Sequence, residues 1–396
     1  MKTGTRPAPT RITSIDALRG LTIAFMILVN DPGDWKHVYG QLDHSEWNGL
    51  TLTDLVFPNF LFLVGCSIVF AMVSRVAAGV SRTTIALQIV RRAAIIFTIK
   101  MALTAFPHFH LTHLRIFGVL TRIALCYLVA GLIYLYCRSA RYLIAITVAL
   151  LVGYWILMRF VPVPGLGHPV TDFPLLDHDR NLAAWMDRGF NAWCQRWLHT
   201  GLLYERTRDP EGLLSTVPAV ATTLIGVLAG LWLRRPHSEA ARTRNMLVLA
   251  GAALLSVGYA WGLVFPVNKN LWTSSYVLVC GGWSLIALAL FFWLLDAVRI
   301  QDRSRVARAM LWPMLVYGSN AITAFALSNL IVMSLIAWKV PRGDGNLTTA
   351  WNWPYTHLFA RHGSTDNASL AFALVFVLLC FLPNWLLWRK RIFLRV

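Results

Sequence analysis

Long apolar stretches recur along the whole chain, and they constrain its fold more than any other feature. A helix needs about 20 apolar residues to cross a hydrocarbon core of roughly 30 Å. Of the residues, 57% are hydrophobic and 14% are charged, too little charge for the surface of a soluble protein. The sequence therefore predicts an all-α polytopic membrane protein. It holds about ten expected spans, at residues 17–36, 53–74, 88–106, 115–137, 142–161, 213–233, 245–265, 274–298, 311–338 and 368–388.

The basic residues predict how these spans are oriented. The formal net charge is +18, from 36 Lys and Arg against 18 Asp and Glu. In a soluble chain this excess would suggest nucleic acid binding, but here most of it lies in short segments between apolar stretches, as in cytoplasmic loops. We therefore expect no nucleic-acid partner, both termini in the cytoplasm, and the loop between the first two spans outside. The basic residues on the expected cytoplasmic side include Arg75, Arg91, Arg92, Arg138, Arg234, Arg299 and Arg389.

The hinge between the first two spans carries the residues best suited to chemistry. Its polar and ionisable residues include Asn30, Asp43, His44, Glu46 and Asp54. A histidine can take a proton near neutral pH, and an asparagine amide can donate to a developing oxyanion. Ionisable groups such as Asp54, just inside a span, are costly and more often functional than accidental. We interpret the hinge as a reaction centre; the structural alternative for His44 is a hydrogen bond to Asp43 or Glu46.

Charged residues inside other spans indicate ion pairs or a bound anion. Asp16 and Arg19 are three residues apart at the start of the first span, so a helix places both on one face. Arg19 is either a snorkelling arginine with its counterion or a residue that receives a phosphate-bearing cofactor. Arg122 lies two turns inside the fourth span and must face the bundle interior, either in an ion pair or bound to an anion.

The expected outer loops carry further polar residues. The longest, residues 162–212, has an amphipathic helical pattern typical of a lid or an interfacial helix. Lys269 and Ser275 lie where another polar loop leads into an apolar helix, which fits either helix capping or a binding site. The three histidines of an outer loop have no carboxylate or cysteine nearby in sequence, so we expect no metal site; they are His108, His110 and His113.

Several long motifs together resemble the heparan-α-glucosaminide N-acetyltransferase family. They occur from about residue 11 to residue 320 and are far more specific than a short consensus. The matching stretches are SIDALRGL (14–21), ILVNDPGDW (27–35), HSEWNGLTLTDLVFPNFLFLVG (44–65), LRIFGVLTRIALCY (114–127), DPEGLLSTVPA (209–219) and VNKNLWTSSY (267–276).

The resemblance implies an activity and its participants. Members of the family are implied to pass an acetyl group from cytosolic acetyl-CoA to the amino group of a terminal glucosamine across the membrane. We expect one transmembrane acyltransferase domain over residues 1–396, a central cofactor-binding pore and a homodimer. The lysosomal relative carries an extra luminal domain before the first motif, whereas this chain begins its first span almost at once. We therefore expect a multi-pass protein of the bacterial inner membrane that acts on a small amino sugar.

The resemblance also implies roles for individual residues. His44 matches the family's catalytic histidine, expected to deprotonate the attacking amine, and Asn30 matches the asparagine expected to donate to the thioester oxygen. Asp43 or Glu46 is expected to fix the imidazole tautomer. The residues of the predicted catalytic set are His44, Asn30, Asp43 and Asp54, and those predicted to bind the cofactor are Arg19, Asp16, Arg122, Lys269 and Ser275.

Other functions fit parts of the same pattern. An amino-sugar permease would also hold polar residues between spans, although clear paired repeats are absent from the sequence. An O-acyltransferase of envelope glycans would share the opening motif. A structural scaffold gives no reason for Arg122 or the polar hinge. Within the acetyltransferase hypothesis we favour direct transfer, and a route through acetyl-His44 stays open.

Overall fold

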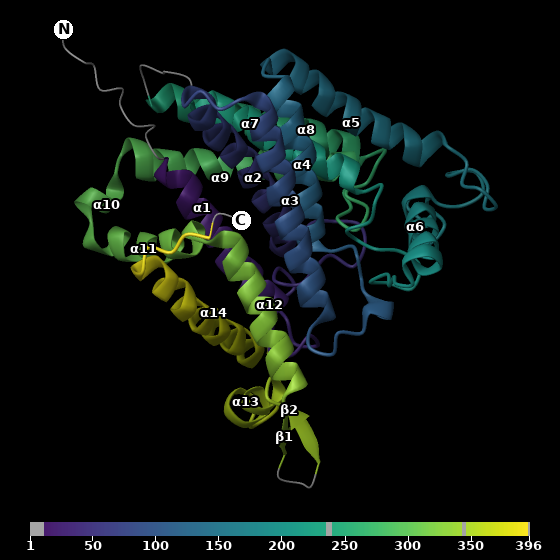
Figure 1. Ribbon diagram of the computed structural model, residues 1–396, viewed down its shortest axis with the longest axis vertical. Coiled ribbons are helices and arrows are strands. Elements are labelled where there is room, and N and C mark those ends of the chain that lie inside the picture. The colour runs from purple at the N-terminus through teal and green to yellow at the C-terminus, as the bar shows by residue number, and fades with distance from the viewer. Residues whose placement is uncertain (1–11, 235–239, 343–345, 395–396) are drawn as a thin grey trace.

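The computed structural model describes residues 12–234, 240–342 and 346–394, and within these ranges it is almost entirely helical (Figure 1). Eight described helices are long and apolar enough to cross a membrane. The predicted all-α polytopic membrane protein is thus confirmed. The eight are α1 (Thr13–Asn30), α2 (Leu52–Ala77), α4 (Val119–Tyr136), α5 (Ala140–Phe160), α7 (Thr216–Leu233), α8 (Ala240–Gly262), α9 (Ser274–Phe291), which continues as the π-helical η2 (Phe292–Ala297), and α14 (Asp366–Arg389).

The other elements are shorter or less apolar. The two strands pair antiparallel as a small hairpin. These elements are α3 (Arg82–Ala105), η1 (Leu111–His113), α6 (Leu182–Leu198), α10 (Ile300–Arg303), α11 (Arg305–Ser319), α12 (Ala321–Ala337), β1 (Lys339–Pro341), β2 (Leu347–Thr349), α13 (Asn352–Pro354) and η3 (Tyr355–Phe359).

Two of the expected spans are not among these eight helices. The expected span at 88–106 is α3, which is not among the eight because Arg91, Arg92 and Lys100 interrupt its apolar residues. The expected span at 311–338 is the pair α11 and α12, which are bent by 83° at the break between them. The described part of the chain therefore holds eight helices that can cross a membrane, or nine if the bent pair counts as one span.

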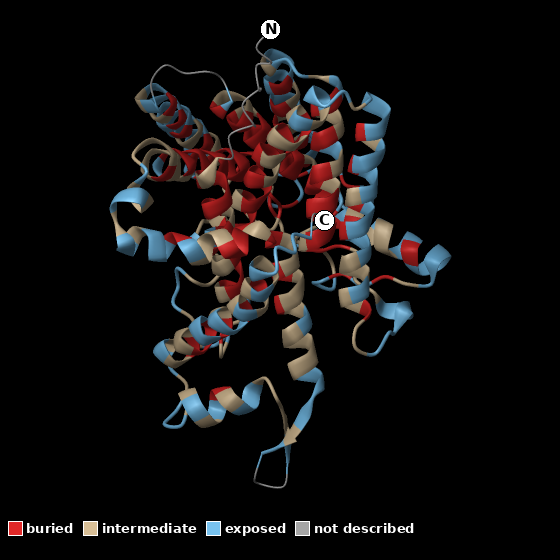
Figure 2. Cartoon of the chain, turned by 60° about the vertical axis from the view of Figure 1, so that its left-hand side comes forward, coloured by how far each residue is buried: buried red, intermediate tan, exposed pale blue. Residues whose placement is uncertain are grey.

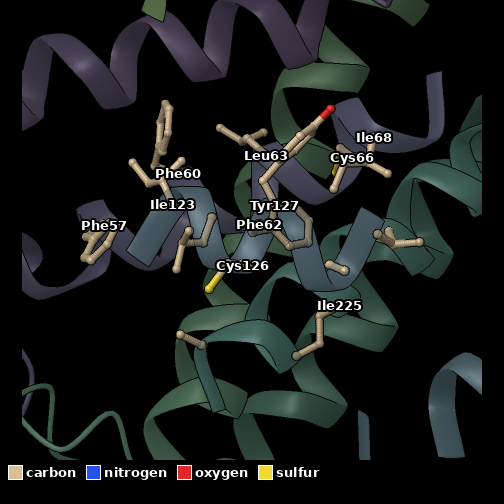
Figure 3. Close-up of a cluster of buried hydrophobic side chains, with 14 of the residues drawn as sticks. Phe57, Phe60, Phe62, Leu63, Cys66, Ile68, Ile123, Cys126, Tyr127 and Ile225 are labelled. Atoms are coloured by element: carbon tan, nitrogen blue, oxygen red, sulfur yellow. The ribbon is translucent and has the colours of Figure 1, made fainter. Parts of the chain in front are cut away.

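The centre of the bundle is built from α2, α4 and α7. In α7, 78% of the spanning residues are buried, against 17% in α8, so α7 lies inside and α8 presents its apolar side chains to lipid. Figure 2 shows the buried residues gathered in the middle of the bundle. Figure 3 shows the side chains that meet there, among them Phe57, Phe60, Ile123, Tyr127 and Ile225.

Glycines let the two central helices touch. A Cβ atom on Gly65 of α2 would lie 2.0 Å from the carbonyl oxygen of Thr223, and one on Gly226 of α7 would lie 1.9 Å from that of Phe62. Small residues at helix interfaces allow such close backbone contact. Any side chain at either position would push α2 and α7 apart.

The helices cross the bundle back and forth, which separates their loops into two ends. At one of them, here called the hinge end, the loop of residues 31–51 meets the segments 161–215 and 263–273. The indole N–H of Trp47, for example, donates to the carbonyl oxygen of Leu176 at 2.9 Å. The loops that follow α1, α5 and α8 therefore form one surface.

The opposite end, here called the basic end, carries the start of α1 and the ends of α2 and η2. Asp296 of η2 accepts hydrogen bonds from the backbone N–H groups of Thr13, at 2.9 Å, and Ser14, at 3.0 Å. Arg75, in the last turn of α2, lies at this end. The arginines that follow α2 are thus separated from His44 by the thickness of the bundle.

Candidate active site

His44 and Asp54 form a hydrogen-bonded pair at the hinge end. Nδ1 of His44 lies 2.8 Å from Oδ1 of Asp54. The imidazole is 39% exposed, whereas the carboxylate is fully buried. A carboxylate only accepts, so Nδ1–H donates, and in the neutral imidazole the lone pair is on Nε2. A base oriented by a third group in this way is suited to general base catalysis.

Asp54 is held in place by the local sequence around the start of α2. Its Oδ2 accepts from the backbone N–H and the hydroxyl of Thr51, both at 3.1 Å, and from the N–H of Ser45 at 3.2 Å. Thr51 and Asp54 form the capping box of α2. A negative charge in the first turn also interacts favourably with the helix dipole.

Lys269 completes the cluster from the loop before α9. Its Nζ lies 2.8 Å from Nδ1 and 2.9 Å from Nε2 of His44, and 3.6 Å from Oδ1 of Asp54. Because the two distances to the ring nitrogens are nearly equal, the Lys269 ammonium lies over the face of the imidazole. Burial lowers the pKa of Lys269, and the charges of Asp54 and Glu211 oppose this shift.

Two other residues of the predicted catalytic set lie farther from the imidazole. Asn30 is the last residue of α1 and is exposed, and no hydrogen bond joins it to His44 among the described residues. Asp43 bonds to the backbone of His44 and not to its imidazole, since its Oδ1 accepts from the backbone N–H of His44 at 2.7 Å. The ring contact that we expected from Asp43 or Glu46 is made by Asp54.

The long segment 161–215 packs beside the hinge. The ring of Trp47 stacks on His178 with centroids 3.8 Å apart, and the guanidinium of Arg208 lies 4.4 Å from the centroid of the same indole. Trp47 is only three residues from His44. The segment expected to form a lid is thus attached next to the candidate site.

A cavity of about 790 Å³ opens at the basic end. Its walls come from α1, α2, α3, α4, the break between α11 and α12, and the residues after α14. Arg19, Arg75, Arg91 and Arg92 line it. Arg75 and Arg91 have no acidic partner among the described residues. Such an arginine-lined cavity is suited to a ligand with phosphate groups.

The inner end of the cavity approaches the histidine cluster along α2. Phe60 lines the cavity, and Asp54 lies on the same helix. Asp54 and Phe60 are six residues apart, which corresponds to about 9 Å along a helix axis. The buried side chains between the two levels include Phe57, which packs edge to face on Trp272 with centroids 5.2 Å apart.

The segment that follows α14 is fastened to the cavity wall at the α11–α12 break. Asn320 at the α11–α12 break donates from Nδ2 to the carbonyl oxygen of Ile392 at 3.0 Å, and its Oδ1 accepts from the N–H of Leu394 at 2.9 Å. Phe393 and Leu394 belong to the cavity wall. A single buried amide therefore fixes this part of the cavity wall.

We expect Asn320→Ala to release this segment. Two hydrogen bonds of about 1 kcal/mol each are lost, so a cysteine at Leu394→Cys should react with a thiol reagent roughly tenfold faster or more. Mass spectrometry separates this site from the native cysteines. The matched control is Asn329→Ala on α12, whose amide bonds to Phe325 of its own helix and to no other described residue. Equal labelling in both backgrounds would show that Asn320 does not hold the segment.

Comparison with known proteins identifies the kind of chain that carries this site. A family model described as "Heparan-alpha-glucosaminide N-acetyltransferase, catalytic" matches residues 11–260. The chain belongs to this family. Human heparan-alpha-glucosaminide N-acetyltransferase is 30% identical over 334 residues, which cover 73% of this chain and 49% of the human protein. The mouse protein of the same name is also 30% identical over 334 residues, covering 74% and 50%. The chain thus spans about half the length of these curated relatives.

In this member of the heparan-alpha-glucosaminide N-acetyltransferase family, the residues predicted to bind the cofactor lie in different places. Arg19 lines the cavity, and its Nη2 donates to Asp16 at 2.8 Å. Lys269 and Ser275 lie at the hinge end. The fully buried hydroxyl of Ser275 donates to a loop carbonyl at 2.5 Å. The cavity therefore brings Arg19 together with Arg75, Arg91 and Arg92, which the sequence pattern indicates only as markers of orientation.

Arg122 lies between the two levels and is 1% exposed. Its Nη2 donates to the carbonyl oxygen of Gly212 at 3.3 Å and to the hydroxyl of Ser215, and its guanidinium lies 4.8 Å from the ring centroid of Trp272. Its Nε and Nη1 have no hydrogen-bond partner among the described residues. Buried N–H groups without acceptors are unusual, so Arg122 stays a candidate to bind an oxygen of a substrate.

Asp31, which directly follows Asn30, is not among the residues predicted from the sequence. Burial raises the pKa of this carboxyl to about 7. In the sequence, only its position next to Asn30 indicates that Asp31 belongs to this region. The described part of the chain holds no group of three or more His, Cys, Asp or Glu side chains that could bind a metal ion, and this includes His108, His110 and His113.

Proposed function

We propose that this chain is a membrane N-acetyltransferase. It would take the acetyl group of acetyl-CoA at the basic end and transfer it to the amino group of a glucosamine-type acceptor at the hinge end. One observation carries the proposal: an imidazole oriented by a buried carboxylate lies at the hinge end, and an arginine-lined cavity approaches the same helix from the basic end. The family and the name of its curated relatives support the same reaction.

The cavity suits acetyl-CoA in size and charge. Ligand sites commonly enclose about 300–1,000 Å³, and this one measures about 790 Å³. The nucleotide end carries several phosphate charges, which Arg75, Arg91 and Arg92 would hold. The thinner pantetheine arm would extend toward Phe60 and Ile123, which line the cavity farther along α2 and α4.

The residues at the hinge end would carry the proton. The amine nitrogen attacks the thioester carbon, and its proton passes to Nε2 of His44. Asp54 stabilises the imidazolium that forms. When the C–S bond breaks, the imidazolium returns the proton to the CoA thiolate, so the products are the N-acetyl sugar and CoA. Asn30 stays the predicted oxyanion donor, and direct transfer stays preferred over acetyl-His44.

The proposal also covers how the protein is oriented in the membrane, which membrane it lies in and its oligomeric state. The arginines at the basic end support a cytoplasmic location for that end and for both termini. We also propose that the protein lies in a bacterial inner membrane, that residues 1–396 form one domain with 162–212 as a lid, and that it works as a homodimer. The acceptor class is the least constrained part, and an amino-sugar permease or a glycan O-acyltransferase is the alternative.

A reconstituted assay tests the reaction and its direction. Proteoliposomes are loaded with acetyl-CoA, and glucosamine is added outside; N-acetylglucosamine is then measured by mass spectrometry. We expect product from the fraction of molecules whose basic end faces the lumen, and none when acetyl-CoA is left out. Uptake of unmodified glucosamine without product would favour the permease. Product only from hydroxyl sugars would favour the O-acyltransferase.

We further expect Arg75→Gln and Arg91→Gln each to raise the KM for acetyl-CoA by about tenfold or more with little change in kcat. A hydrogen bond to a charged group contributes about 1.5–3 kcal/mol, and both side chains lie in the cavity wall. The matched control is Arg138→Gln, an exposed arginine between α4 and α5 that does not line the cavity. An unchanged KM in both cavity variants would place the donor elsewhere.

A further inference from the structure

Lys269 is a counterion of the buried Asp54 carboxylate, but its amine lies closer to the imidazole of His44. Its Nζ is closer to the two ring nitrogens of His44, at 2.8 and 2.9 Å, than to Oδ1 of Asp54, at 3.6 Å. Asp54 already accepts four hydrogen bonds, from the imidazole, the Ser45 N–H, and the N–H and hydroxyl of Thr51. Lys269 therefore adds its charge to a carboxylate that already has donors, and it lies close to the imidazole as well.

The Lys269 amine lies as close to His44 as an acceptor amine would have to come. Its Nζ is nearly equidistant from the two ring nitrogens, so it lies over the face of the imidazole and not along the in-plane lone pair of Nε2. In the proposed reaction the acceptor is also a primary amine, and it must give its proton to Nε2. The Lys269 side chain is 16% exposed, so it is largely enclosed by the loops of the hinge end.

We propose that Lys269 occupies the position of the acceptor amine and that the donor acetylates it when the acceptor is absent. This inference rests on the proposed function, because the thioester must reach His44. When glucosamine binds, it displaces the lysine amine and receives the acetyl group instead. Lys269 is then a modification site whose acetylation blocks the enzyme.

The self-acetylation step uses only groups already named. The neutral Nζ of Lys269 attacks the thioester carbon and its proton passes to Nε2 of His44. The new C–N bond forms, the C–S bond breaks, and the imidazolium returns the proton to the CoA thiolate. The products are Nε-acetyl-lysine and CoA. An amide is not an activated acyl group, so the modified lysine is a dead end and not an intermediate in transfer.

The surroundings of Lys269 favour the neutral amine that this step needs. The loop of residues 263–273 is folded inward by Asn268, whose Nδ2 donates to Asn48 at 3.1 Å and whose Oδ1 accepts from the N–H of Leu271 at 2.9 Å. Burial then lowers the pKa of Lys269, while Asp54 and Glu211 oppose the shift. Exposed lysines at the same end, such as Lys36, lack this environment.

The test incubates the full-length protein in liposomes with ¹³C-acetyl-CoA and maps acetyl-lysine by mass spectrometry. We expect ¹³C-acetyl at Lys269 at least tenfold above the level at the exposed Lys36 and Lys339. The label should fall at least tenfold in His44→Gln and in wild type with saturating glucosamine. The longer the wild-type protein is incubated with acetyl-CoA alone, the lower its rate of glucosamine acetylation should be when glucosamine is added afterwards. The rate of Lys269→Arg, whatever its initial value, should not fall during the same incubation.

The same samples separate failure of this inference from failure of the proposed function. If glucosamine is acetylated while Lys269 carries no more label than Lys36, the inference is overturned and the proposed function stands. Label at Lys269 that persists in His44→Gln is nonenzymatic and also overturns it. If neither glucosamine nor Lys269 is acetylated, both proposals fail together.

Discussion

His44→Gln lowers acetyl transfer to glucosamine by about a hundredfold to ten-thousandfold, the range usual for loss of a general base. Glutamine keeps a polar side chain of similar length but cannot take the amine proton at neutral pH. The imidazole is 39% exposed and its partner Asp54 keeps three other donors. We therefore expect the variant to fold and to bind acetyl-CoA with a nearly unchanged Kd.

The measurement is kcat for N-acetylglucosamine formation, with acetyl-CoA binding recorded on the same preparation. The matched control is His113→Gln, an exposed histidine whose imidazole bonds to its neighbour Thr112. This control should keep wild-type kcat. A His44→Gln enzyme with more than a tenth of wild-type kcat would mean that another group removes the proton.

Gly226→Ala lowers the free energy of unfolding by about 3 kcal/mol or more, at the upper end of overpacking costs. The added Cβ would lie 1.9 Å from the carbonyl oxygen of Phe62, so the backbones of α2 and α7 must separate. Both helices belong to the buried centre of the bundle, and α2 carries Asp54 at its start. Larger side chains at this position should prevent assembly.

Thermal unfolding of detergent-solubilised protein, followed by size-exclusion chromatography, measures the loss. Gly153→Ala on α5 is the matched control, because an added Cβ there has no atom within 4 Å. It should leave the unfolding temperature nearly unchanged. If both alanine variants unfolded at the wild-type temperature, the close contact between α2 and α7 would be contradicted.

The membrane class and the place of the hinge could be predicted because both depend on local sequence. Apolar stretches define helices that cross a membrane whatever they pack against. The capping pair Thr51 and Asp54 lies within four residues, so the position of the carboxylate at the start of α2 follows from nearby residues. His44 is close enough along the chain for its pairing with Asp54 to be a local event as well.

Contacts between distant segments could not be predicted in the same way. Lys269 meets His44 across 225 residues of sequence, and nothing local in the loop before α9 indicates its partner. The break at Asn320 is equally hidden, because residues on both sides of it are apolar and the amide is engaged by Ile392 and Leu394. Hydropathy follows apolar content and carries no information on such long-range hydrogen bonds.

The wall of buried aromatic rings between the cavity and the histidine cluster has a consequence for the cell. Phe57 packs edge to face on Trp272, and Phe60 lines the cavity. Figure 3 shows Phe57 and Phe60 among the buried side chains. Ions and protons cross such an apolar layer only at high cost. If the pantetheine arm fills this layer and brings only its thioester to His44, no ion or proton needs to cross. The enzyme can then work continuously without discharging the electrochemical gradient. A transporter of charged substrates has to prevent such a discharge with coupled gates.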